Sequence, residues 1–361
     1  MYIDEWGWFN DFYRSACIAG DTERQQLVTI WNEAWHYIQP EPDRTLALIN
    51  QAHALATRLR EPCFRLFYDY WRCEIFMFYK YDYAMALDLA TRAVVEARKP
   101  EYAHCPFLAR TYRILLDAHI YLDPVGYLDK AREIIAYLEA EVPMGMDTAR
   151  LLQDRRRTLA FAQGDLDGAY QVALRFLEQS QNYDFYLAHA HSLLCALSYT
   201  LGKPEDALKH AQESEIYAQQ SRRLRVSMTL YCWQALINQK LGNTNTARHM
   251  YNTAAAQSTQ IDPPLPSSYY TVLAEYHELC GDSATAADFS AQGLAHIVAQ
   301  KSPYFECEGR LERCRLLGRL NQPTLKDDIA AAHEAAKKLL KPDLYLSRLA
   351  RVEQGIYTDA W

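Results

Sequence analysis

The chain has 361 residues, of which 50% are apolar and 23% charged, so it can bury a core and is not intrinsically disordered. Thirteen glycines and 14 prolines are few for this length, which argues against a turn-rich all-β protein and favours helix. The formal net charge of −7 disfavours a nucleic-acid binder, because such proteins usually carry a basic stripe.

The chain begins with acids and aromatics where a secretory leader would be basic and then apolar. No run approaches the roughly 18 apolar residues that a membrane span needs. We therefore expect a cytoplasmic protein that does not bind membranes. The nine cysteines form no Cys-x-x-Cys pair, and we expect buried thiols, not a disulfide framework or a zinc site.

An internal repeat is marked by four glycines and by an alanine five residues after each. The glycines, spaced 38, 40 and 39 residues apart, are Gly164, Gly202, Gly242 and Gly281, and the alanines are Ala169, Ala207, Ala247 and Ala286. A glycine can adopt the positive φ that ends a helix, and an alanine permits a close approach of two helices. The pattern predicts helix, tight turn, helix.

A weaker form of the same glycine–alanine pattern recurs in the rest of the chain. Tyr81 stands there in a glycine position and Thr45 in an alanine position. An aromatic cap helix, or alternatively a docking surface, is expected over 1–22. Eight helix pairs are expected over 23–341, and a closing cap helix over 343–361. The pairs span 23–60, 62–99, 103–141, 146–181, 184–220, 223–260, 266–301 and 303–341.

These features resemble the tetratricopeptide repeat family, in a variant with repeats of 38 to 40 residues. The matching strings include TLGKPEDA and KLGNTNTA, followed by small residues at Ser214 and Ala254. The resemblance implies an all-α, right-handed α-solenoid in which each pair stacks on the next. It also implies that the first helix of each pair lines a concave groove.

Ten residues are expected to line that groove, grading from aromatic to polar along the chain. They are Tyr68, Trp71, Phe78, Tyr79, Tyr112, His119, Asp154, His189, Ser192 and Tyr199. Each aromatic could instead pack between helices. Aromatic side chains with one polar end are typical of surfaces that hold peptides.

The remaining motifs do not indicate a catalytic or metal-binding site. Three consecutive arginines at 155–157 point in different directions, and we expect Arg157 to be partly buried and paired with Asp154 or Asp165. The sequence contains no phosphate loop, nucleophile elbow or paired-histidine metal motif, so no cofactor or metal is expected.

We therefore expect a non-catalytic scaffold that binds a protein or peptide in the groove. The main alternative is a regulator that senses a small molecule or a signalling peptide. An enzyme is the third possibility, with Asp154, Glu275 and His119 as its candidate residues.

Overall fold

The computed structural model describes residues 4–38, 40–181, 183–261 and 265–358. The described residues form 18 α-helices and one short 3-10 helix, and they contain no β-strand. The chain divides into two compact units, 1–152 and 153–361, with the boundary inside helix α8. The predicted division into a 1–22 cap, a 23–341 repeat domain and a 343–361 cap stays a prediction.

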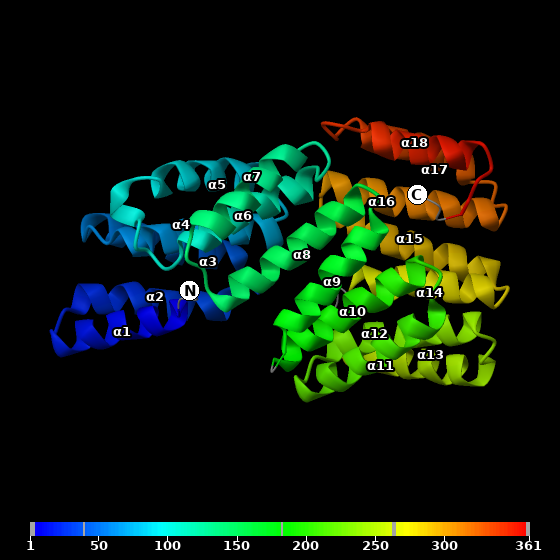
Figure 1. Cartoon of the computed structure of the whole chain (residues 1–361), viewed down its shortest axis with the longest axis horizontal. Coiled ribbons are helices and arrows are strands. Elements are labelled where there is room, and N and C mark those ends of the chain that lie inside the picture. The colour runs from blue at the N-terminus through cyan, green and yellow to red at the C-terminus, as the bar shows by residue number, and fades with distance from the viewer. Residues whose placement is uncertain (1–3, 39, 182, 262–264, 359–361) are drawn as a thin grey trace. The chain divides into compact units, whose positions relative to one another are not determined.

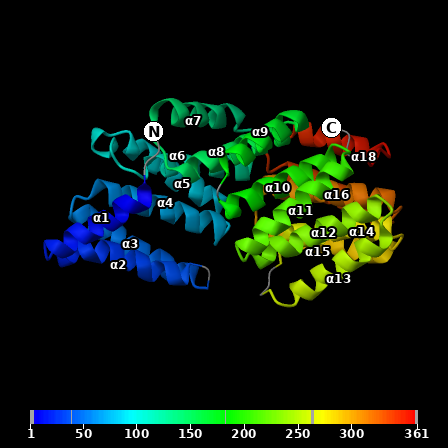
Figure 2. The ribbon, with the colours of Figure 1, turned by 60° about the horizontal axis from the view of Figure 1, so that its bottom comes forward.

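The first unit consists of consecutive helices that pack side by side (Figures 1 and 2). Contacts also join the first helices of successive pairs, α4 and α6. The helices are α1 (Glu5–Ile18), α2 (Thr22–Tyr37), α3 (Pro42–Arg58), α4 (Pro62–Phe78), α5 (Tyr83–Ala97), η1 (Pro100–Tyr102), α6 (Leu108–Leu122), α7 (Leu128–Glu141) and the start of α8 (Met146–Ala162).

In the second unit most consecutive helices also pack side by side, and α12 contacts both α10 and α14, the first helices of the neighbouring pairs. Its helices after α8 are α9 (Leu166–Gln179), α10 (Asp184–Thr200), α11 (Pro204–Gln220), α12 (Leu224–Lys240), α13 (Thr244–Ser258), α14 (Ser267–Leu279), α15 (Ser283–Ala299), α16 (Pro303–Arg319), α17 (Leu325–Ala336) and α18 (Asp343–Glu353). Each of the eight expected pairs therefore corresponds to two observed helices.

The predicted turns have the expected backbone conformation. All four repeat glycines adopt positive φ, from 71° at Gly202 to 81° at Gly242, and Tyr81 in its glycine position has φ 53°. At Gly202, the turn closes because Lys203 N donates to the carbonyl of Ser198. Local chemistry thus ends one helix and starts the next at the predicted places.

The predicted close approaches are also confirmed. The four repeat alanines and Thr45 have no exposed surface. Gly293 shows how tight these contacts are, because a Cβ there would lie 3.1 Å from Thr271 Cγ2. Small residues therefore let neighbouring helices pack closely along both units.

Helix α1 is held to the first unit by an aromatic cluster and a buried ion pair. The rings of Trp8, Phe9 and Phe12 pack against Phe64 of α4, with centroid distances of 5.3, 5.5 and 4.5 Å. The Glu5 carboxylate accepts a hydrogen bond from Arg110 Nε at 2.5 Å. Burial raises the pKa of Glu5, although Arg110 opposes the shift.

The expectation that all nine cysteines are unpaired thiols is wrong for two of them. Cys63, in the first turn of α4, and Cys105, just before α6, form a disulfide. The sequence gives no local signal for this bond, because the two residues are 42 positions apart and meet only when successive repeats stack. The other seven are free, and five of those are buried.

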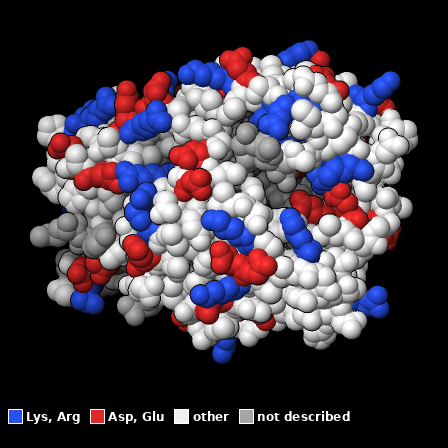
Figure 3. All heavy atoms as spheres, turned by 45° about the vertical axis from the view of Figure 1, so that its right-hand side comes forward, with Lys and Arg blue, Asp and Glu red and all other residues white. Residues whose placement is uncertain are grey.

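In the described part of the chain, no helix is long and apolar enough to cross a membrane. Lysines and arginines are interspersed with aspartates and glutamates over the face shown in Figure 3.

Candidate tryptophan site

Three tryptophans surround an open hollow of about 410 Å³ in the first unit. Its lining consists of Trp6 from α1 and of Trp31, Asn32, Trp35 and His36 from α2. Trp35 is 52% exposed and Trp6 39%, whereas Trp31 is buried. A large aromatic surface is therefore exposed to solvent and available to a ligand.

Helical spacing creates this patch on α2. Residues four apart lie on the same face of a helix, so Trp31 and Trp35 adjoin each other, as do Asn32 and His36. Helix α2 begins after Gly20, whose φ is 68°, and Asp21 caps it by accepting a hydrogen bond from the backbone N–H of Arg24 at 3.0 Å. The buried face of α2 includes Leu27, Trp31 and Ala34, and Trp35 lies at the edge of that face, where it stays 52% exposed.

A fourth tryptophan, Trp71 of α4, packs against both tryptophans of α2. Its ring centroid lies 4.3 Å from that of Trp31 and 5.6 Å from that of Trp35. The plane of Trp35 is inclined by 51° to Trp31 and by 79° to Trp71. The indoles therefore form inclined walls and not a flat stack.

Trp6 is positioned by its neighbour in the sequence. Glu5 is anchored to Arg110, and the Arg110 guanidinium lies 5.5 Å from the centroid of Trp6. The carboxyl of Glu5 also rests against Gly145, where a Cβ would lie 3.0 Å from Glu5 Cδ. The buried ion pair thus fixes the first turn of α1 and, with it, one side of the hollow.

Of the predicted groove residues in the first unit, four are buried. Tyr68 has no exposed surface, and its hydroxyl donates to the backbone carbonyl of Leu27. Trp71 is 7% exposed and backs the tryptophans of α2. Tyr112 packs on Tyr137 with centroids 4.7 Å apart. These three contribute to packing and not to an open surface.

His119 is the fourth buried residue, and it stacks on Tyr127 with centroids 4.5 Å apart. Burial, together with nearby Lys130, lowers the pKa of His119 to about 4, so its ring is neutral near pH 7. Phe78 and Tyr79 are half-buried at the end of α4, and the Phe78 ring lies 5.4 Å from that of Tyr121.

In the second unit, Asp154 is buried and already paired. Arg157 Nε donates to one of its oxygens at 2.9 Å, and Arg155 Nη1 to the other at 2.8 Å. The predicted pairing of Arg157 is confirmed. Burial opposes the charge of Asp154, but Arg157, His189 and Arg155 together hold its pKa well below the usual range.

The other predicted residues of the second unit lie on α10. His189 is half-buried, with Nε2 3.8 Å from Asp154. Ser192 and Tyr199 are also half-buried. The Tyr199 ring packs 5.4 Å from that of Trp233 and lies under Lys240 Nζ at 4.4 Å. These α10 residues keep some exposed surface for a partner.

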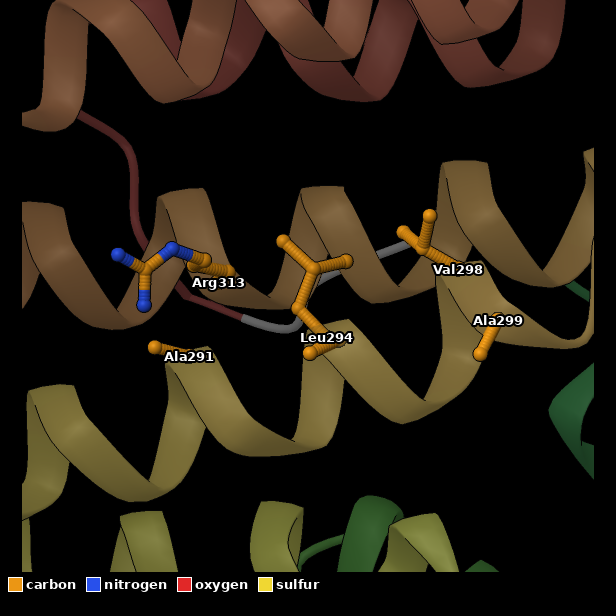
Figure 4. A pocket seen from close by; sticks show the side chains of 6 residues that line it. Ala291, Leu294, Val298, Ala299 and Arg313 are labelled. Carbon is orange, nitrogen blue, oxygen red and sulfur yellow. The ribbon is translucent and has the colours of Figure 1, made fainter.

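A second hollow, of about 550 Å³, runs along α15 in the second unit (Figure 4). Alanines and two larger apolar residues, Leu294 and Val298, form its floor, and Arg313 of α16 closes one end. Arg313 is engaged, because its guanidinium donates to Asp328 at 2.8 Å and to the carbonyl of Ala287 at 3.2 Å. This hollow therefore offers mainly a shallow apolar surface.

The sequence pattern indicated Trp71, but not the two tryptophans of α2 that pack on it, of which Trp35 is exposed. Trp31 and Trp35 stand four apart within the first helix of the first expected pair, and that spacing was a usable signal. Trp6 was assigned only to a cap or docking segment. Its place beside α2 depends on the ion pair between Glu5 and Arg110, which no local pattern reveals.

Among known proteins, no family model matches the chain and no curated protein matches it. The crystal structure of a Rap protein complexed with competence and sporulation factor is similar, with a TM-score of 0.54 and 11% identity. The match covers 81% of this chain and 82% of that one.

BtubC (BKLC) from P. vanneervenii also matches, with a TM-score of 0.46 and 18% identity, over 58% of this chain and 89% of that one. Identity of 11% supports a likeness of fold alone for the Rap protein. With the paired helices and glycine turns described above, that likeness shows that this chain has a tetratricopeptide-like, all-helical repeat fold.

Proposed function

We propose that the protein is a non-catalytic scaffold that binds a protein segment or peptide and that the tryptophan hollow is its anchor site. The observation that carries the proposal is the exposed face of Trp35, 52% open beside Trp6 and above two buried indoles. Tryptophans in such settings are frequent hot spots of binding interfaces. The partly exposed residues of α10, Ser192 and Tyr199 among them, are proposed as additional groove contacts.

The energy available at Trp35 is sufficient for an anchor. An aromatic side chain can bury about 150 to 250 Å², so covering the open half removes about 100 Å² from water. At about 25 cal/mol per Å², this corresponds to about 2 to 3 kcal/mol, or roughly a 30- to 150-fold change in affinity.

Two observations weigh against an enzyme. Asp154 is neutralised by Arg155 and Arg157, and His119 is buried against Tyr127. Both side chains therefore act in packing and charge pairing. A regulator that senses a ligand is the second candidate, because about 410 Å³ lies within the size range of small-molecule sites and the similar Rap protein was solved with a bound factor.

A random peptide library displayed on phage tests the proposal. Peptides enriched on the native protein should bind Trp35→Ala at least about tenfold more weakly. Ile216→Ala is the matched control, because Ile216 of α11 is a 50% exposed apolar residue outside the proposed contacts, and this variant should bind normally. Enriched peptides that bind Trp35→Ala and native protein equally would refute the anchor role.

A further inference from the structure

The chemistry of the lining narrows what the tryptophan hollow can bind. Among the described residues, the lining includes three indoles, one amide and one imidazole, but no aliphatic side chain and no aspartate, glutamate, lysine or arginine. Apolar ligands usually meet a mixture of aliphatic and aromatic walls. A lining dominated by indole instead offers electron-rich ring faces.

The concentration of tryptophan at this place is itself unusual. Four of the seven tryptophans in the chain, from helices α1, α2 and α4, are Trp6, Trp31, Trp35 and Trp71. Indole presents the strongest negative ring face among the aromatic side chains and is the best partner for a cation. Trp35 and Trp6, 52% and 39% exposed, are the two indoles of the lining that offer most surface to one ligand.

The described lining contains no carboxylate, which disfavours a cation that must donate hydrogen bonds. A primary ammonium or a guanidinium must find acceptors for its N–H groups when it leaves water. The nearby carboxylates are already paired: Glu5 with Arg110 at 2.5 Å, and Glu33 with Arg44 at 3.7 Å. A quaternary ammonium needs no acceptor, and only its charge and methyl groups must be accommodated.

We propose that the hollow binds a quaternary ammonium group carried on a peptide side chain, as in trimethyl-lysine. This inference rests on the proposed function and specifies its anchor. Trp35, Asn32 and His36 are all exposed, so the hollow opens to solvent on the α2 side and leaves a path for the aliphatic stem. The volume of about 410 Å³ accommodates the methylated head together with part of that stem.

Three short peptides that differ at one side chain test the inference. One carries trimethyl-lysine, one carries lysine, and one carries a neutral tert-butyl analogue of the same length. Binding is measured by calorimetry and by quenching of tryptophan fluorescence, with tetramethylammonium chloride as a free competitor. Trimethyl-lysine should bind about tenfold more tightly than either analogue, and tetramethylammonium should displace it.

Trp35→Leu separates charge recognition from apolar contact, because leucine keeps an apolar surface but removes the ring face. This variant should lose most of the preference for trimethyl-lysine over the tert-butyl peptide, whereas Ile216→Ala should keep it. Equal binding of the two peptides by the native protein would overturn the inference.

Failure of the ammonium inference can be distinguished from failure of the proposed scaffold function. If none of the three peptides binds, but peptides from the phage library still require Trp35, the ammonium inference fails and the scaffold function stands. If no selected peptide requires Trp35, the anchor role fails as well.

Discussion

Ala247→Leu tests whether the repeat depends on close helix packing. Ala247 follows Gly242 by five residues, has no exposed surface, and lies in the core cluster that includes Cys232, Leu236 and Leu273. Leucine adds three heavy atoms where neighbours leave no room, and overpacking of this kind costs about 1 to 3 kcal/mol. For a unit of this size, the melting temperature should fall by about 2 to 12 °C.

Ala256→Leu is the matched control, because Ala256 lies on the same helix, α13, but is exposed. Alanine and leucine have similar helix propensities, so this change should alter stability by less than about 0.5 kcal/mol. Circular dichroism melts of both variants and the native protein provide the comparison. Equal melting temperatures for the two variants would refute the predicted register of the repeat.

Three further predictions concern a turn, a buried histidine and the disulfide. Gly242→Ala should destabilise by about 1 kcal/mol, because φ there is 81° and no atom lies within 4 Å of the added Cβ. Gly242→Asn should cost less, and an unchanged urea midpoint for the alanine variant would contradict the strain argument. His119 has a folded pKa of about 4 but takes up a proton near pH 6.5 when unfolded. The unfolded state therefore binds more protons between these values, and stability falls as pH falls from about 6.5 to 4. His119→Phe keeps the stacking on Tyr127 and should remove about 3 kcal/mol of that loss, whereas identical pH profiles of unfolding would contradict the assignment. Reduction of Cys63–Cys105, which closes a separation of 42 residues, should destabilise the first unit by up to about 4 kcal/mol. Cys63→Ser/Cys105→Ser should melt at the same temperature with and without reductant, and a native protein equally indifferent to reductant would argue against the bond.

The fold was predictable because its signals are local. A glycine with positive φ and a buried alanine five residues later both follow from the backbone of a single turn, as at Gly242 and Ala247. Other turns hide this signal, because Arg222 and Asn321 adopt positive φ without being glycine. Periodicity alone could therefore not mark every boundary.

The site was less predictable because exposure depends on contacts between distant segments. Tyr68 and Trp71 share a helix and a register, yet both are buried, since α2 covers them with Leu27 and Trp31. The exposed anchor belongs instead to Trp35, on that covering helix. The pairing of Cys63 with Cys105 likewise depends on the stacking of two repeats.

Site-specific cross-linking tests the binding role of the tryptophan hollow most directly. A photoreactive residue replaces Asn32, in the hollow, or Glu205, exposed on α11, and a Trp35-dependent peptide is added before irradiation. The account predicts a covalent adduct at position 32 and none at 205. An adduct at 205, or equal yields at the two positions, would contradict it.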